Sequence, residues 1–122
     1  MTMQVLAVDD SRTMRDMVRL ALNAEGIEAH LAEDGIHGLE VLDEMNPPDA
    51  IITDINMPRM DGFGFIDAVR SREEYRSIPI LVLTTESAAE MKARAREAGA
   101  TGWIVKPFDP AKLVKAVRMV AG

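Results

Sequence analysis

Short apolar runs alternate five times with segments that have helical periodicity. The runs occupy residues 4–8, 27–32, 50–53, 78–84 and 101–105. After each run, a turn leads into apolar residues spaced three and four apart, which is the spacing of one buried helix face. Repeated βα units with right-handed crossovers build a parallel sheet that helices cover on both faces. The sequence therefore predicts an α/β fold with a doubly wound, five-stranded parallel sheet and five helices.

Local signals predict how the helices begin and which side chains they bury. Met17 lies in the apolar stripe of the first helix, so we expect it to be buried. Ser87 opens a Ser-Ala-Ala-Glu segment that matches a capping box, in which the two polar side chains bind free backbone N–H groups at a helix start. Asp109 is predicted to cap the last helix, with Pro110 at its first position.

The composition favours one domain and excludes several kinds of site. With 122 residues, of which 48% are hydrophobic, the chain can bury one core, and we expect a single domain over residues 1–122 without an output domain. The absence of cysteine excludes disulfides and thiolate metal sites. A net charge of −6 argues against binding nucleic acid through a broad basic surface. No apolar run approaches the roughly 20 residues of a membrane span and the first residues lack the parts of a secretory signal, so a cytoplasmic protein is expected. We also expect a monomer.

Polar residues stand at the carboxyl ends of four predicted strands. Asp9 and Asp10 follow the first strand, Asp54 follows the third, Thr84 closes the fourth, and Lys106 follows the fifth. Open parallel sheets bind ligands beyond the carboxyl ends of their strands. If the first and third strands are neighbours, three carboxylates lie close together and raise one another's pKa unless a cation intervenes. Asp54, at the end of a buried strand, is the candidate reactive group.

The residue types in this set indicate metal-assisted phosphoryl chemistry. Oxygen ligands without histidine or cysteine suit Mg²⁺, which usually binds one or two protein carboxylates and keeps several waters. An aspartate beside Mg²⁺, a lysine and a hydroxyl group is equipped to attack a phosphoryl group. We therefore predict that Asp54 is the nucleophile and that Lys106 helps to stabilise charge on the phosphoryl oxygens.

Each of these residues also has an ordinary structural role open to it. Asp9 and Asp10 could cap the first helix, where the helix dipole favours acidic groups. Thr84 could satisfy backbone groups at a strand end, and Lys106 could be a solvated charge. Trp103 could belong to the core. The functional interpretation depends on the joint occurrence of these residues at one predicted edge of the sheet.

Five motifs follow one another along the whole chain. They are Val8-Asp9-Asp10-Ser11, Thr53-Asp54-Ile55-Asn56-Met57-Pro58, Asp61-Gly62, Leu83-Thr84-Thr85 and Lys106-Pro107-Phe108. In this order and spacing they resemble the receiver domain of two-component response regulators. The resemblance implies a flavodoxin-like fold with strand order 2-1-3-4-5. It also implies that a phosphohistidine on a sensor histidine kinase phosphorylates Asp54.

The resemblance further implies roles for individual residues. Mg²⁺ would be held by Asp10, Asp54 and the main-chain carbonyl of Asn56, with Asp9 acting mainly through water. Lys106 would pair with the phosphoryl group, and the peptide bond from Lys106 to the following proline would be cis.

Two segments are similar to the single-domain chemotaxis regulators of this family, namely residues 10–15 and 102–108. This likeness implies a kinase of the chemotaxis type upstream and a flagellar motor switch protein downstream. Trp103 takes the place of the switch aromatic, usually Tyr or Phe, and its larger indole is expected to turn inward less readily. The surface expected to respond is the fourth helix, fifth strand and fifth helix, with exposed Lys92, Arg96, Val105, Lys112 and Lys115.

Two classes of function fit this constellation, a phosphorylation-controlled binding switch and an aspartate-nucleophile phosphatase of the haloacid dehalogenase type. The phosphatase needs a second carboxylate two residues after the nucleophile, to protonate the leaving group and activate water. Asn56 stands there, and an amide cannot take the proton of the water, so we expect a switch. A phosphorelay intermediate is an alternative within the family. Asn56 and Glu86 occupy positions that tune the lifetime of the acyl phosphate in the family.

Overall fold

The computed structural model describes residues 2–122 and contains five strands, five α-helices and one 3₁₀ helix. The strands are β1 (Gln4–Val8), β2 (Glu28–Ala32), β3 (Ala50–Thr53), β4 (Ile80–Thr84) and β5 (Gly102–Val105). The helices are α1 (Arg12–Asn23), α2 (Gly35–Glu44), α3 (Gly62–Ser71), η1 (Glu73–Tyr75), α4 (Ala89–Ala98) and α5 (Pro110–Ala121). Strands and α-helices alternate as predicted, and only the short η1 was not expected.

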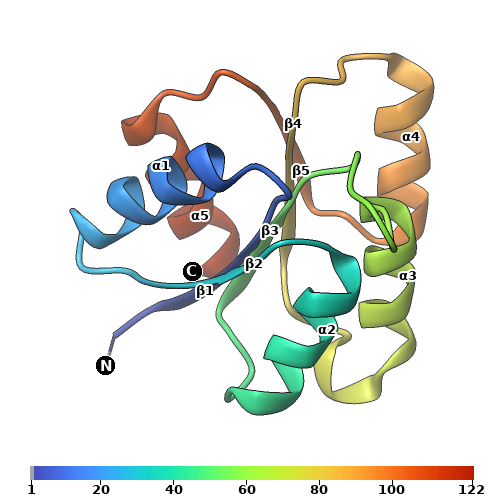
Figure 1. Cartoon of the computed structure of the whole chain (residues 1–122), viewed down its shortest axis with the longest axis horizontal. Helices are drawn as coiled ribbons and strands as arrows, with labels where there is room; N and C mark the ends of the chain where they lie inside the picture. Colours follow the sequence, from blue (N-terminus) through green and yellow to red (C-terminus); the bar gives the residue numbers. More distant parts are fainter. Residues whose placement is uncertain (1) are drawn as a thin grey trace.

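The sheet is entirely parallel, with strand order β2-β1-β3-β4-β5 (Figure 1). This confirms the predicted fold class and the strand order that the resemblance implied. β3 lies between β1 and β4, and all four of its residues are buried, as expected of a central parallel strand. In the β1–β3 register Val8 pairs with Thr53, so the residues that follow these two strands emerge side by side.

Helices cover both faces of the sheet and bury two clusters of apolar side chains. Helices α1 and α5 lie on one face, and α2, α3 and α4 lie on the other (Figure 1). Alternate residues of each strand point to opposite faces. In β3, for example, Ile52 packs with the α1 and α5 side, whereas Ile51 packs with the α2 and α3 side. Within residues 2–122, no helix is both long and apolar enough to cross a membrane.

The burial of Met17 was predicted wrongly. Its side chain is 44% exposed, whereas Val18, Ala21 and Leu22 are buried against the sheet. The buried stripe of α1 is therefore narrower than the apolar periodicity suggests, and Met17 lies at its edge.

The starts of α4 and α5 also differ in detail from the sequence signals. The N-cap of α4 is Ala88, and its first turn closes from Met91 N–H to the Ala88 carbonyl. The predicted capping box is wrong because the helix begins one residue later than Ser87 would require. Asp109 is the N-cap of α5 as predicted, but its side chain makes no capping hydrogen bond.

Candidate functional site

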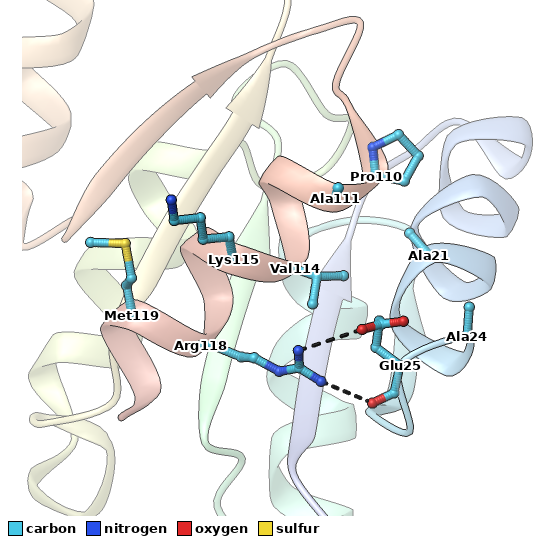
Figure 2. Close-up of a pocket in the computed structure, with 9 residues that line it drawn as sticks. All are labelled: Ala21, Ala24, Glu25, Pro110, Ala111, Val114, Lys115, Arg118 and Met119. Carbon is cyan, nitrogen blue, oxygen red and sulfur yellow. Dashed lines mark hydrogen bonds and ion pairs between the residues drawn. The ribbon is translucent and has the colours of Figure 1, made fainter.

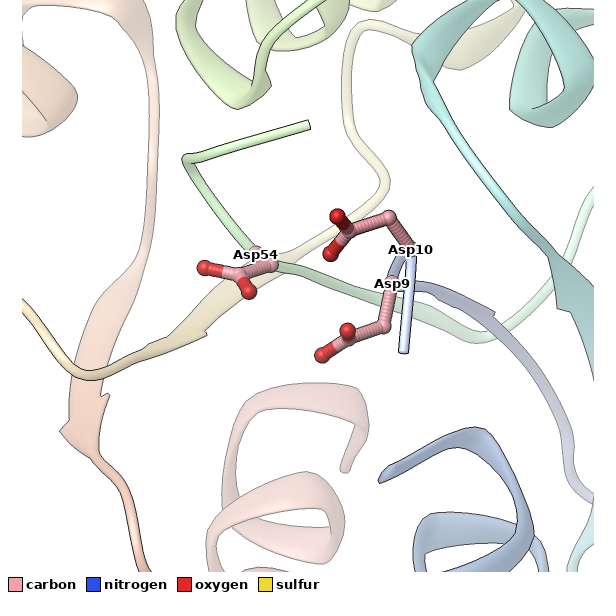
Figure 3. A group of neighbouring side chains, drawn as sticks. All are labelled: Asp9, Asp10 and Asp54. Carbon is pink, nitrogen blue, oxygen red and sulfur yellow. The ribbon is translucent and has the colours of Figure 1, made fainter. Parts of the chain in front are cut away.

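Three carboxylates meet where β1 and β3 end (Figure 3). Asp9 and Asp10 follow β1, and Asp54 follows β3. One oxygen from each lies within 4.8 Å of the others. Asp9 and Asp54 are buried, whereas Asp10 is exposed. The register of two adjacent strands thus assembles the acidic cluster that the sequence predicts, with one member open to solvent.

Lys106 reaches this cluster from the end of β5. Its Nζ lies 2.7 Å from Asp9 Oδ2 and 2.8 Å from Asp54 Oδ2. The side chain is only 10% exposed, so it is not the solvated charge that a lone lysine suggests. Its backbone N–H donates to the Thr84 carbonyl at 2.8 Å, which holds the start of the loop after β5 beside the end of β4. The Lys106–Pro107 peptide bond is cis, as the resemblance implied.

The charges of the cluster are not balanced. Among the described residues, Lys106 is the one cation that forms an ion pair with any of these carboxylates, and it pairs with two of them, Asp9 and Asp54. Burial raises the pKa of Asp9, although hydrogen bonds from Lys106 and from the Ser11 N–H oppose the rise. Burial alone would lower the pKa of Lys106, but its hydrogen bonds to Asp54 and Asp9 outweigh this and raise it. Lys106 therefore stays protonated, and a further cation would relieve the excess negative charge.

Short-range contacts fix the direction of the Asp54 carboxylate. Its Oδ1 accepts a hydrogen bond from the Ile55 N–H at 2.6 Å, and its Oδ2 faces Lys106. Gly62 begins α3 close beside this strand end, where its N–H donates to the Ile55 carbonyl at 2.8 Å. A Cβ at Gly62 would lie 2.2 Å from the Asp54 carbonyl oxygen. Glycine is thus required for α3 to approach the strand end this closely.

A chain of polar contacts links Glu86 to Thr84, to Trp103 and to Asn56. Thr84 is fully buried, and its Oγ1 accepts from the Glu86 N–H at 3.4 Å. The Trp103 indole N–H donates to the Glu86 carbonyl at 3.0 Å. The Asn56 side-chain amide donates to Glu86 Oε1 at 3.1 Å. Glu86 thus connects the ends of β3 and β4 to β5, through its main chain and its side chain together.

One contact at the site was missed in the sequence. Arg15, in the first turn of α1, is half-buried and donates to the Asp9 carbonyl at 2.7 Å. Ser11 caps α1 by accepting from the Met14 N–H. The signal available in the sequence was the spacing of Arg15, one turn beyond the cap.

The residues predicted for a partner surface are distributed over α4, β5 and α5. Lys92, Arg96 and Trp103 line one shallow hollow between α4 and β5. Lys115 instead lines a hollow of about 560 Å³ between α1 and α5, next to the Arg118–Glu25 ion pair (Figure 2). Val105 and Lys112 are exposed but line neither hollow.

The acidic cluster has the chemistry of a Mg²⁺ site. Its donors are all carboxylate oxygens, the hard ligands that Mg²⁺ prefers. Mg²⁺ keeps several waters, which the exposed position of Asp10 permits. The cluster of Asp9, Asp10 and Asp54 is therefore compatible with a bound Mg²⁺ ion.

Comparison with known proteins agrees with this geometry. The model of the response regulator receiver domain matches residues 5–118. The chemotaxis protein CheY1 of Helicobacter pylori is 40% identical over 121 residues, covering 98% of each chain. The structure of Vibrio cholerae CheY4 is 45% identical with a TM-score of 0.93, covering 98% of this chain and 99% of that chain.

A more distant solved structure bears on the metal. The receiver domain of the Pseudomonas aeruginosa sensor histidine kinase PA1611, with a magnesium ion coordinated in its active site cleft, is 26% identical with a TM-score of 0.90. The alignment covers 100% of this chain and 99% of that one. On the extent of these matches and on the fold they share, the chain belongs to the response regulator receiver domain family.

Proposed function

We propose that this chain is a phosphorylation-controlled switch in which Asp54 accepts a phosphoryl group from a sensor histidine kinase. The observation that carries this proposal is the position of Lys106, whose ammonium bonds Asp54 and Asp9 at the edge of an acidic cluster. A lysine held there can pair first with the carboxylate and then with the oxygens of an incoming phosphoryl group.

The transfer is a displacement at phosphorus. A carboxylate oxygen of Asp54 forms the new P–O bond, and the P–N bond to the kinase histidine breaks, leaving its electron pair on the imidazole. The Ile55 N–H and Lys106 orient the carboxylate for this attack. Asp10, Asp54 and the Asn56 carbonyl would hold Mg²⁺, with Asp9 acting mainly through water. The bound ion would supply charge neutralisation at the phosphoryl oxygens.

The acyl phosphate should persist because the position two residues after the nucleophile offers no general base for water. Asn56, two residues after Asp54, offers an amide, and that amide is already bonded to Glu86. This favours a signalling switch with slow self-dephosphorylation over a turnover phosphatase.

The phosphoryl group adds roughly −1.5 to −2 charges and new acceptor oxygens. The Thr84 hydroxyl would turn toward them, loosening its contact with the Glu86 N–H. Trp103 is bonded to the carbonyl of the same residue, so the change would reach the surface of α4 and β5. Such a switch shifts an existing equilibrium between two conformations.

The partners follow from the similarity to chemotaxis proteins. We infer a CheA-like sensor histidine kinase upstream and a flagellar motor switch protein downstream, for a cytoplasmic, monomeric, single-domain regulator. Lys92, Arg96, Val105, Lys112 and Lys115 are the surface residues to test for partner contact. A phosphorelay intermediate is the alternative within the family. A pull-down that compares phosphorylated with unphosphorylated chain would separate the two roles by the partner it recovers.

The single tryptophan provides a direct test. Addition of Mg²⁺ and acetyl phosphate should change Trp103 fluorescence, and Asp54→Ala should abolish the change. Asp67→Ala is the matched control, because it removes an exposed aspartate from α3. An unchanged response in Asp54→Ala would refute the assignment of Asp54. Steady release of phosphate from simple phosphomonoesters would favour the phosphatase instead.

A further inference from the structure

A second buried aspartate holds the loop that follows Asp54. Asp34, directly before α2, accepts from Arg59 Nε on Oδ2 at 2.8 Å and from Arg59 Nη2 on Oδ1 at 3.0 Å. Its Oδ1 also accepts from the His37 N–H at 2.9 Å, which caps α2. The Asp34 side chain is 4% exposed, whereas that of Arg59 is 54% exposed. Both carboxylate oxygens are therefore fully engaged, one of them twice.

The backbone at Arg59 shows that this contact selects a particular loop shape. Arg59 has a φ of 63°, and within residues 2–122 it is the one non-glycine residue with a positive φ. This left-handed conformation is unfavourable for an arginine, so surrounding contacts must maintain it. Capping of α2 requires only the His37 N–H bond, so the bidentate pair with Arg59 is an additional contact across 25 residues of sequence.

A second contact docks the same loop on the start of α2. The Gly35 N–H donates to the Met60 carbonyl at 3.2 Å. A Cβ at Gly35 would lie 2.6 Å from Met60 Cγ and 2.8 Å from the Met60 carbonyl oxygen. The loop therefore lies directly against α2, at a spacing that only glycine allows.

These contacts surround the stretch that carries Asn56. On one side, the Ile55 carbonyl accepts from the Gly62 N–H at 2.8 Å. On the other, Arg59 and Met60 are held on α2. We propose that Arg59 and Asp34 are positioning residues, which hold this loop so that the Asn56 main-chain carbonyl can bind Mg²⁺. The inference rests on the proposed function, since it assumes that the cluster binds this ion.

The test measures Mg²⁺ affinity by calorimetry, with MgCl₂ alone as the probe. Arg59→Gly removes the ion pair but tolerates the positive φ, and Asp34→Asn retains a capping side chain without the charge. Each should weaken Mg²⁺ binding by about tenfold, the lower end for lost outer contacts at a metal site. The double variant should lose little more than either single one, because both remove the same contact. Arg59→Lys should recover only part of the affinity, since it cannot form the bidentate pair.

A matched control and a local readout separate positioning from general stability. Arg19→Ala breaks the exposed Arg19–Asp16 pair and removes the same charge without touching the loop. It should leave Mg²⁺ affinity unchanged or slightly raised, as expected from the lost positive charge. Hydrogen exchange at the amides of Gly35 and Met60, which are hydrogen-bonded in the docked loop, should accelerate in Arg59→Gly, while urea unfolding shows that the variant remains folded.

The outcomes distinguish this inference from the proposed function. If the unmodified chain binds Mg²⁺ and Arg59→Gly binds it equally well, the positioning role is refuted and the proposed function stands. If the unmodified chain binds no Mg²⁺, the proposed function fails and the positioning role fails with it. A loss of affinity in both single variants, without a further loss in the double variant, supports the inference.

Discussion

Asp34 and Asp9 are both buried aspartates that face a cation, yet their surroundings have opposite effects. Asp34 has Arg59 to itself, and the hydrogen bonds from that guanidinium hold the pKa of Asp34 below its ordinary value. Asp9 shares Lys106 with Asp54 and lies beside Asp10. Burial raises the pKa of Asp9, and the shared lysine does not overcome this effect.

The contrast separates a structural ion pair from a binding site. At Asp34 the charges match one to one, both carboxylate oxygens are bonded, and nothing further is required. At the strand ends three carboxylates lie together and the one ammonium pairs with only two of them, so a divalent cation and then a phosphoryl group have both a place and an electrostatic reason to bind. Removal of a carboxylate charge should therefore change stability in opposite directions in the two regions.

The largest effect on stability should come from Asp34→Ala. The change removes the α2 cap and the charge-assisted hydrogen bonds to Arg59, so the free energy of unfolding should fall by about 2–3 kcal/mol; the Arg59 guanidinium that remains is largely exposed and adds no buried-charge penalty. Urea unfolding without Mg²⁺ measures this. Asp67→Ala, at an exposed position, should change stability by no more than about 0.5 kcal/mol. An equal change in the two variants would contradict a specific role for Asp34.

Lys106→Met should have the next largest effect on stability. Without Mg²⁺, the free energy of unfolding should fall by about 1–3 kcal/mol. This is less than the value for a fully buried pair, because Asp10 opens the cluster to solvent. Mg²⁺ should reduce the loss, since it supplies the missing positive charge. A loss that is the same with Mg²⁺ and with a chelator would show that Lys106 acts only through packing.

Asp10→Asn should have a smaller effect of the opposite sign. Without Mg²⁺ it relieves repulsion among the three carboxylates, so stability should rise by about 0.2–1 kcal/mol, the range for exposed charge pairs. With Mg²⁺ the sign should reverse, because the variant has lost a ligand. Thermal unfolding with and without the ion tests both parts, and destabilisation in the absence of Mg²⁺ would contradict the charge excess.

The smallest expected effects concern how stability depends on pH in the acid range. The pKa of Asp34 is below the ordinary 3.8 in the folded chain, so its stabilising contribution is complete above that value and is lost as the pH falls through the lowered pKa. The pKa of Asp9 is above 3.8, so its contribution is lost as the pH rises through the raised pKa. In metal-free urea titrations, the free energy of unfolding of Asp34→Asn should approach that of the unmodified chain as the pH falls. The free energy of unfolding of Asp9→Asn should rise relative to that of the unmodified chain as the pH rises above about 4.

The fold was largely predictable because it depends on local patterns. The apolar runs locate the strands, and the rule for parallel sheets places Asp9, Asp54 and Lys106 at one edge. The strand order and the cis bond after Lys106 came from the family resemblance alone.

The contacts that escaped prediction join residues far apart or depend on where a helix begins. Arg59 is 25 residues from Asp34, and each has an ordinary loop or cap role when taken alone. Glu86 bonds Asn56 across 30 residues. Ser87 matches a capping motif, but the helix begins one residue too late for it to act. Such details require the relative positions of loops, which periodicity does not encode.

Intact mass spectrometry after incubation with acetyl phosphate tests the central claim most directly. With Mg²⁺, the unmodified chain should gain the mass of one phosphoryl group, and a chelator should prevent the gain. Asp67→Asn should behave like the unmodified chain, and Asp54→Asn should gain nothing. Phosphorylation of Asp54→Asn to the same extent, or no phosphorylation of the unmodified chain with Mg²⁺ present, would contradict the assignment of Asp54 as the phosphoacceptor.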